Sequence, residues 1–359
     1  MAQLGPGWAF GLNAVSFAAM LIVLSRWRPD PMASTLPPEG FGAGLRAGLR
    51  YALRAGRLQA VLIKSAGFFF FASAATALLP LVVRAEMHGG AGLYGILLGC
   101  IGVGAVTGAL VLLATLACAL SLFGLAWLRH MALLPLAMLV NGFAWITVLS
   151  SLQIAAQTAV PAWVRARALS LYIMVFSLGM AAGGLSWGSF AQRTSIPLAL
   201  TVASVGAVIA GLLVWRVRIA GSEELDLRPA GYWPAPELAV PVSHDRGPVL
   251  VTVEYRIAEA DRAAFHALMG ELGRTRRRDG AVVWGVAEDV ATPGIHLEYF
   301  VTSSWLEHLR QHERVTAEDG EHQRKVRALH DGEYAPKVRH FVGGAGALAA
   351  LKPGHAHLG

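Results

Sequence analysis

Residues 58–83 read LQAVLIKSAGFFFFASAATALLPLVV, an apolar run whose only charged side chain is that of Lys64. A helix of about 20 apolar residues crosses the hydrocarbon core of a bilayer. From Leu58 to Val217 the chain contains a single carboxylate, Glu86, in a short polar segment. A water-soluble domain of this length would carry Asp and Glu over its surface. The sequence therefore predicts a polytopic membrane bundle.

Apolar runs recur along the first two thirds of the chain, and all but one have the length of a single span. They are Leu4–Leu24, Leu58–Val83, Leu93–Leu128, Met131–Gln157, Ala168–Phe190 and Pro197–Val217. The third run would form a helix of about 54 Å, which is too long for one crossing. We expect it to cross twice, with a turn near Ala114–Cys118.

The arginines that flank the spans support two crossings. In that arrangement Arg84, Arg129 and Arg193 face outward and the other flanking arginines face inward, whereas one crossing divides them almost evenly. Cytoplasmic loops carry an excess of Lys and Arg. The sequence therefore predicts seven spans, with the N-terminus outside and the C-terminal part in the cytoplasm.

The composition changes sharply after Arg218, where Asp and Glu become frequent. The expected fold class is an all-α membrane bundle followed by a soluble α+β domain. The expected organisation is a first transmembrane helix (1–25), a cytoplasmic loop (26–57), a six-helix transmembrane bundle (58–217), a linker (218–247), a soluble domain (248–343) and a disordered tail (344–359).

The loop 26–57 contains a basic amphipathic pattern. Leucines and arginines each recur every four residues, which places them on adjacent faces of a helix. This pattern is typical of a helix that lies on the anionic inner leaflet, and a target helix for a soluble partner is the alternative. The residues concerned are Phe41, Leu45, Leu49 and Leu53, with Arg46, Arg50 and Arg54.

Polar side chains within the spans are the candidates for a substrate path. Gln153 and Gln157 are four residues apart and share a helix face, and Asn141 lies in the same span. Each could contact a polar substrate or form a hydrogen bond to a neighbouring helix. Lys64 is expected to extend its ammonium group toward the inner interface. The loop motif Arg165 and Arg167 is expected on the cytoplasmic side.

Glycines four residues apart occur repeatedly in two of the runs. Such spacing lets helix backbones approach closely, and it also permits bending or sliding. Static packing and a moving gate therefore remain two interpretations. The glycines are Gly95, Gly99, Gly104 and Gly108 in the long run, and Gly179, Gly183, Gly184 and Gly188 near Ala168–Phe190.

The overall charge and the cysteines point away from other classes of protein. The net charge of +7 and the pI of about 9.8 arise from arginines that flank apolar spans, which disfavours nucleic acid as a partner. Cys100 and Cys118 lie in apolar runs and are interpreted as small buried residues. We expect no metal and no cofactor; the expected partners are the lipid bilayer and a small-molecule substrate.

Residues 248–343 alternate between strand and helix patterns in the order β-α-β-β-α-β. The first strand is indicated by alternation through Val249, Val251 and Val253, and Asp279-Gly280 marks a turn into the strand Ala281–Val286. This order is the ferredoxin-like arrangement. Its sheet keeps one open face, so a homodimer through this domain is expected.

Histidines and aromatic residues in this domain leave alternatives open. His308 and His312 are four apart beside Glu313, but further ligands are not evident from the spacing, which favours a solvated or dimer-facing polar strip over a metal site. Trp284, Tyr299 and Trp305 could line a small apolar pocket or belong to the core.

Two segments resemble a known family. They are the stretch AWVRARALS at 162–170 between two spans, and SWLEHLRQHERVT at 304–316, which begins with a capping-box pattern. Together with the order of the spans, these resemble major facilitator transporters of the enterobactin-exporter-like, transmembrane secretion effector type. The resemblance covers the family's sixth helix onward, so the chain is expected to be truncated and to lack the first five helices. The basic loop between the family's eighth and ninth helices is also missing, which accounts for the long run Leu93–Leu128.

The resemblance implies export of a small molecule such as a siderophore or a drug by alternating access. Residues 248–343 are also similar to dimeric α+β barrels of the antibiotic-biosynthesis-monooxygenase type. That similarity gives the alternative functions, a membrane-tethered dimerisation or regulatory module or a cofactor-free oxygenase-like enzyme. No residue here is assigned as catalytic.

Overall fold

The computed structural model describes residues 6–27, 36–37, 39–104, 111–128, 130, 133–215, 227 and 240–343. Most of the linker 218–247, the whole tail 344–359, Arg129 and Gly108 lie outside the described residues. The chain divides into two compact units, Met1–Glu39 and Gly40–Gly359. In the first unit, α1 (Pro6–Arg26) is an apolar helix that ends at Arg26.

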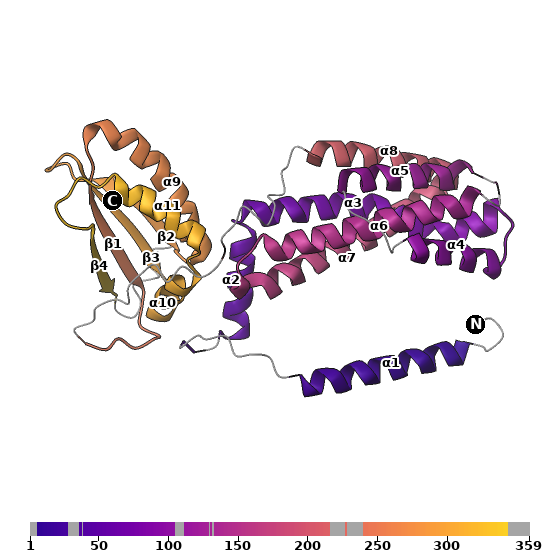
Figure 1. Ribbon diagram of the computed structural model, residues 1–359, viewed down its shortest axis with the longest axis horizontal. Helices are drawn as coiled ribbons and strands as arrows, with labels where there is room; N and C mark the ends of the chain where they lie inside the picture. Colours follow the sequence, from indigo (N-terminus) through magenta and orange to yellow (C-terminus); the bar gives the residue numbers. More distant parts are fainter. Residues whose placement is uncertain are drawn as a thin grey trace, which may run out of the picture. The chain divides into compact units, whose positions relative to one another are not determined.

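The second unit begins with a short helix and a bundle of long helices (Figure 1). α3 packs against α7, α4 against α6, and α5 against both α6 and α8. α3 contains Pro80 and continues into a turn of π-helix, Val82–Glu86. The helices are α2 (Phe41–Ala52), α3 (Gly56–Leu81), α4 (Ala91–Gly104), α5 (Val111–Trp127), α6 (Leu133–Thr158), α7 (Ala162–Arg193) and α8 (Ile196–Trp215).

Helices of the bundle have the length and apolarity of membrane spans. Within the described residues, four stretches are long and apolar enough to cross a membrane: Gly56–Glu86, Leu133–Thr158, Ala162–Arg193 and Ile196–Val214. The described parts of α1, α4 and α5 form shorter apolar helices. The chain is therefore a multi-pass membrane protein, as its apolar runs predict.

The run Leu93–Leu128 forms two helices, but the turn expected near Ala114–Cys118 is wrong. These residues lie inside α5, where the Thr115 hydroxyl donates to the carbonyl of Val111 at 2.8 Å. Residues 111–127 contain no proline and a single glycine, Gly124. A Cβ at Gly124 would lie near Leu128 and Ala137. α4 instead ends at Gly104, in the part of the run richest in glycine.

The loop predicted around Arg165 and Arg167 is also corrected by the structure. α7 begins at Ala162, directly after Pro161, so both arginines lie in its first two turns. Proline is well tolerated at a helix start because its missing N–H has no intrahelical acceptor there. The alanine-rich stretch after it has high helix propensity, so the helix begins earlier than the apolar run.

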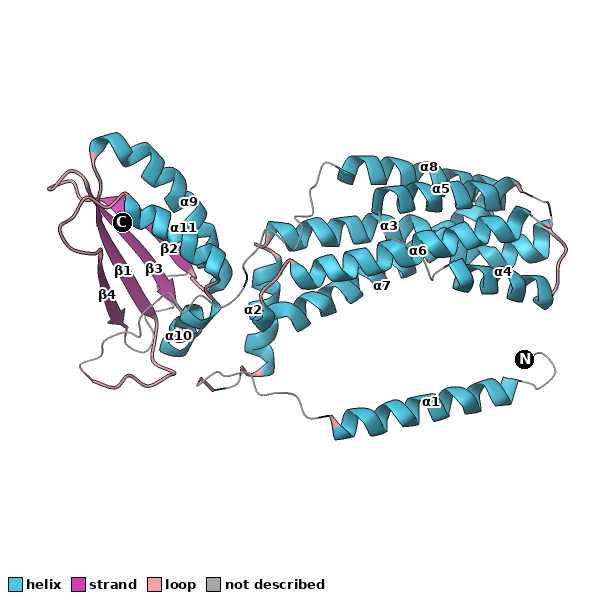
Figure 2. Cartoon of the chain, in the orientation of Figure 1, coloured by secondary structure: helices cyan, strands magenta, loops and turns pink. Residues whose placement is uncertain are grey.

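The C-terminal domain is a four-stranded antiparallel sheet with helices on one face (Figure 2). The strand order is β2-β3-β1-β4. β2 begins two residues later than predicted because Gly280, at φ 140°, and Ala281 still bond to the carbonyl of Arg276. The elements are β1 (Val249–Arg256), η3 (Glu259–Asp261), α9 (Arg262–Asp279), β2 (Val283–Glu288), β3 (Ile295–Thr302), α10 (Trp305–Arg314), α11 (Ala317–Ala328) and β4 (Lys337–Val342).

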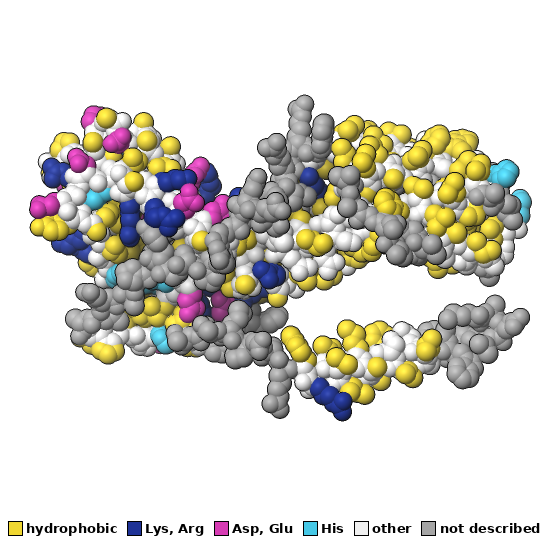
Figure 3. Space-filling model, viewed as in Figure 1, with side chains coloured by type: hydrophobic (Ala, Val, Ile, Leu, Met, Phe, Trp, Pro, Cys, Tyr) yellow, Lys and Arg dark blue, Asp and Glu magenta, His cyan; other side chains and the backbone are white. Residues whose placement is uncertain are grey.

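The two parts of this unit have different surfaces. Hydrophobic side chains cover the visible face of the bundle helices, whereas Lys, Arg, Asp and Glu gather on the C-terminal domain (Figure 3). Large apolar side chains such as Leu185 and Leu213 are 75% and 73% exposed in the bundle. Exposure on this scale requires lipid rather than water around the helices.

Candidate functional site

Asn141 lies inside the bundle and joins two helices. Its side chain is 2% exposed, and its amide donates to the Ser121 hydroxyl of α5 at 2.8 Å. The same amide nitrogen lies 3.8 Å from the sulfur of Cys118. Hydrogen bonds of this kind hold helices together in lipid. Of the two interpretations of Asn141, this geometry is that of a hydrogen bond to a neighbouring helix.

Gln153 and Gln157 are placed differently on the same helix. Both side chains are half-buried on α6, and neither forms a hydrogen bond within the described residues. One turn earlier, the hydroxyl of Ser150 donates a hydrogen bond to the carbonyl of Ile146. The two glutamines therefore offer amide groups that another helix, water or a substrate could use.

Lys64 is half-buried on α3, and no hydrogen bond or ion pair to it is found among the residues described. Its neighbour Ser65 is fully buried and donates to the carbonyl of Val61 at 2.8 Å. Lys64 is thus at the boundary between the packed interior and the outside of the bundle. Its long stem allows the ammonium group to reach an interface.

The predicted glycines of α7 include two that lie directly against α3. A Cβ atom at Gly183 would overlap the Ser73 hydroxyl and the carbonyl of Phe70. At Gly179 it would lie 3.3 Å from the Cβ of Phe69. The indole N–H of Trp187 donates to the same Phe70 carbonyl at 2.9 Å. Gly179 and Gly183 therefore allow the close α3–α7 contact.

The other predicted glycines have more space. A Cβ at Gly184 would meet only Ala77, at 3.9 Å, and at Gly95, Gly99 and Gly188 it would meet nothing within 4 Å. Gly104 is the last residue of α4. The spacing rule also missed two contacts, because their glycines have no glycine partner four residues away. They are Gly142, where a Cβ would overlap the backbone of Ile101, and Gly206, where it would overlap the ring of Phe71.

α2 presents two unlike faces. Leu45 and Leu49 are 61% and 48% exposed on one side. On the other side Gly44 and Gly48 leave room for the Arg167 side chain of α7, whose atoms would lie 2.9 Å from a Cβ at either position. Arg167 is therefore packed across α2, while Arg165 is exposed.

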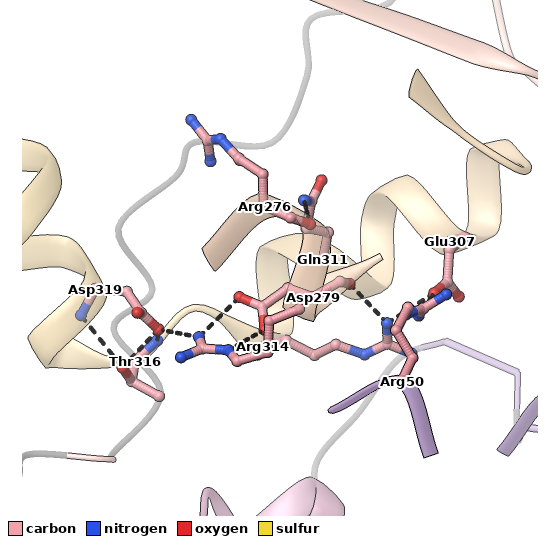
Figure 4. Close-up of polar contacts among 9 residues, drawn as sticks. Arg50, Arg276, Asp279, Glu307, Gln311, Arg314, Thr316 and Asp319 are labelled. Carbon is pink, nitrogen blue, oxygen red and sulfur yellow. Dashed lines mark hydrogen bonds and ion pairs between the residues drawn. The ribbon is translucent and has the colours of Figure 1, made fainter. Parts of the chain in front are cut away.

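Ion pairs and ring contacts join α2 and the start of α7 to the C-terminal domain. Figure 4 shows the ion pair of Arg50 with Glu307. Arg50 donates to the Glu307 carboxylate of α10 at 2.8 Å, and Arg314 donates to the same oxygen at 2.8 Å. The Arg314 guanidinium also lies 4.6 Å from the centre of the Trp163 ring, and Arg278 lies 5.3 Å from that of Tyr51. We call this set of contacts the junction.

The sequence predicted a capping box at Ser304–Glu307, and only half of it forms. The Ser304 hydroxyl accepts from the N–H of Glu307 at 3.2 Å. The Glu307 carboxylate is instead held by Arg50 and Arg314, which explains why it does not cap the helix. A complete capping box forms one helix later, between Thr316 and Asp319.

The interior of the domain contains a charged pair that the sequence did not indicate. Arg276 and Glu298 are 5% and 0% exposed and form two hydrogen bonds of 2.9 and 3.3 Å. The Glu298 carboxylate also accepts from the Trp284 indole at 3.1 Å. Burial, with the Glu298 charge, raises the pKa of Tyr255, whose hydroxyl lies 3.4 Å from the same carboxylate.

The aromatic residues do not share a pocket. Trp284 and Trp305 lie on the helix-covered side of the sheet, where Trp305 is 2% exposed in the core. Tyr299 pairs with Gly285 and lies across it on the opposite side. There it borders an apolar hollow with Leu250, Val283 and Phe341.

His308 and His312 do not form a solvated strip, and that prediction is corrected. His308 is 1% exposed because its side of α10 faces the sheet. His340 of β4 joins the two, and one ring nitrogen of each histidine lies within 4.8 Å of the others. We call this group the histidine cluster. His340 was missed because it is far from the other two in sequence and lies on another element.

Comparison with known proteins supports the membrane assignment. The family model described as transmembrane secretion effector matches residues 1–347, which spans the bundle and the C-terminal domain together. Neither the curated proteins nor the solved structures gave a match. Because the match covers nearly the whole chain, the protein belongs to the transmembrane secretion effector family of major facilitator transporters.

Proposed function

We propose that the bundle exports a small molecule, such as a siderophore or a drug, across a bacterial plasma membrane by alternating access. Membership of the transporter family supports this function. The observation that carries it is the pair Gln153 and Gln157, half-buried on an apolar span without a hydrogen bond among the described residues. An amide that lacks a partner in an apolar medium costs about 2–7 kcal/mol. A polar substrate that passes along this face of α6 would supply the missing hydrogen bonds.

Alternating access requires two sets of helices that rock around a site near the midplane. Ser177 and Ala181 are exposed on α7, and a Cβ at Gly188 would meet nothing within 4 Å. Small exposed residues of this kind accommodate a facing helix. We therefore propose that these helices work with a second set, equivalent to the family's first five helices.

The junction supports a cytoplasmic position for the C-terminal domain. Arg50 and Arg57 contact Glu307 and Glu318 of that domain, while Arg165 and Arg167 lie at the start of α7. Arginines concentrate on the cytoplasmic side of membrane proteins. In this orientation the exposed leucines of α2 would lie against the anionic inner leaflet.

Efflux from whole cells tests the function of the glutamine pair. Cells that express the chain with its second helix set would be loaded with a fluorescent drug, and the outward rate would be measured. Gln153→Ala/Gln157→Ala should lower the rate about tenfold, since one lost hydrogen bond of about 1.4 kcal/mol corresponds to that factor. Thr158→Ala is the matched control because its hydroxyl is satisfied by the carbonyl of Ile154. Equal rates for the glutamine variant and the unaltered protein, at equal expression, would contradict the proposal.

The requirement for a second helix set is tested separately. The chain would be expressed alone and together with the five-helix first half of a family member. Efflux is expected only in the second case. Full efflux by the chain alone would show that a second helix set is not required. The proposed export function would still stand.

A second function, dimerisation of the C-terminal domain, is favoured by the open face of its sheet. We infer that this domain is ferredoxin-like and pairs with a second copy. The open face contains an apolar hollow of about 360 Å³ beside Tyr299 and Phe341, and Phe341 is 50% exposed. Phe341→Glu should convert a dimer in detergent to a monomer, as measured by light scattering. Tyr334→Glu, a change at another exposed aromatic residue, should leave the dimer intact.

A further inference from the structure

The histidine cluster brings together residues from two elements that the sheet topology fixes. His308 and His312 share one face of α10 because they are four residues apart. His340 pairs with Val251 of β1, and Val251 lies in the core on the helix-covered side. Paired residues of neighbouring strands point to the same face. His340 therefore points toward α10, and its ring centre lies 4.8 Å from that of His308.

Among the described residues, neither ring nitrogen of His308 has a hydrogen-bond partner, although both are buried. Buried polar atoms of native proteins are nearly always satisfied, and each exception needs an explanation. Trp305 covers one side of the ring, with ring centres 5.2 Å apart, and it offers no acceptor there. A metal ion, which binds a nitrogen lone pair, would satisfy one of the two ring nitrogens of His308.

The protonation state of the cluster suits a metal ligand. Burial lowers the pKa of His308 to about 2 and that of His312 to about 4, and the neighbouring histidines and Arg276 add to both effects. Burial also lowers the pKa of His340. All three imidazoles are therefore neutral at pH 7, which is the form that binds metal ions.

The spacing of the nitrogens requires a small closure. Three nitrogens on a tetrahedral zinc ion, at about 2.0–2.1 Å from the metal, are about 3.3 Å from one another. In this structure the nitrogens lie within 4.8 Å of one another. His312 and His340 are only half-buried and can rotate about their side-chain bonds. Rotation of these two side chains would bring their nitrogens closer to His308.

The charges around the cluster do not oppose a cation. Arg276 is the cation that affects the pKa of His308 and His312, and its charge is compensated by the buried Glu298. Three neutral nitrogen ligands with one open position are a well-known donor set for Zn²⁺ and related ions. The partly exposed side of the cluster leaves that position for water.

We propose that His308, His312 and His340 form a binding site for a first-row divalent transition-metal ion, with Zn²⁺ as the probe. The site would tie the edge strand β4 to α10. α10 also carries Glu307, which binds Arg50 at the junction, so the metal would stiffen the helix through which the domain contacts α2. This inference does not depend on the substrate or on the transport cycle.

The test uses the full chain purified in detergent, stripped with a chelator and then titrated with Zn²⁺ against a chromophoric competitor. One equivalent should bind per chain. His340→Gln and His312→Gln should each weaken binding at least tenfold, because each removes one of three ligands. His340→Gln is the more informative change, since it lies on a half-exposed edge strand and is less damaging to folding than a change at the buried His308.

Two control variants test whether Zn²⁺ binds to histidines outside the histidine cluster. His266→Gln alters an exposed histidine of the same domain that is outside the cluster. His355→Gln/His357→Gln alters two histidines near the end of the chain. Both should retain one equivalent with unchanged affinity. No stoichiometric binding by the unaltered chain would overturn the proposal, and so would binding that survives in His340→Gln and His312→Gln at full affinity.

Discussion

The bundle and the C-terminal domain use polar groups in opposite ways. In the bundle, neutral groups link helices by single hydrogen bonds: the Trp187 indole donates to the Phe70 carbonyl, and the Ser204 hydroxyl donates to the Ala119 carbonyl. In the C-terminal domain, full charges are buried in pairs, as in Arg276 and Glu298. Lipid gives helices no hydrophobic reason to associate, so close backbone approach and single hydrogen bonds hold them together. The C-terminal domain has hydrophobic clusters of its own, and it encloses a neutralised ion pair beside them.

The largest effect that would test this comparison is expected at the buried ion pair. Arg276→Met leaves the Glu298 carboxylate buried without its guanidinium, which should lower the stability of the domain by about 3–5 kcal/mol. Hydrogen exchange of the β1 and β3 amides in the full chain would measure it. Arg274→Met, at a side chain that is 71% exposed, should change stability by less than about 0.5 kcal/mol. A loss below about 1 kcal/mol for Arg276→Met would show that the pair is not essential to the core.

The stability of the bundle should fall most when the backbones of α3 and α7 are kept apart. Gly183→Leu places a side chain where α7 meets Ser73 and the Phe70 carbonyl, and we expect a loss of about 2–3 kcal/mol from overpacking. Gly188→Leu meets nothing within 4 Å, and it should gain a few tenths of a kcal/mol from better helix propensity. Thermal aggregation in detergent compares the two. Similar behaviour of both variants would show that α3 and α7 can separate without cost.

A smaller effect is expected at the junction, where the two regions meet. Glu307→Gln removes the charge that binds Arg50 and Arg314, and it should weaken the contact by about 1–2 kcal/mol. Hydrogen exchange in α2 should then accelerate about tenfold. Glu321→Gln is the control, because Glu321 is 61% exposed and pairs along its own helix with Lys325. Unchanged exchange in α2 would mean that the ring contacts of Trp163 and Tyr51 hold the junction without the ion pair.

The smallest effect is expected at the exposed ion pair beside it. Arg57 and Glu318 are 41% and 46% exposed and lie 3.2 Å apart. Exposed pairs contribute less than about 1 kcal/mol, because water and salt screen them. Arg57→Ala should therefore leave exchange in α2 within about a factor of two. If Arg57→Ala accelerated exchange in α2 as much as Glu307→Gln does, the exposed pair would be as strong as the part-buried pair.

Local features of the sequence were sufficient for the main architecture. The apolar runs predicted the bundle because the hydrocarbon core sets both the length and the polarity of a span. Alternation of valines predicted β1, and Ser304 predicted the start of α10. Boundaries were less well predicted: the apolar run at Ala168 begins inside α7, since helix formation continues through arginine and alanine as readily as through leucine.

The sequence alone determined that this protein has an apolar membrane part and a charged α+β part, because composition and periodicity act over neighbouring residues. The tertiary structure decided which distant residues meet. It joined His340 to His308 and His312, placed Gly142 against Ile101, and turned Glu307 from a helix cap into a partner of Arg50. These contacts depend on strand register and helix approach, and no local pattern in the chain contains that information.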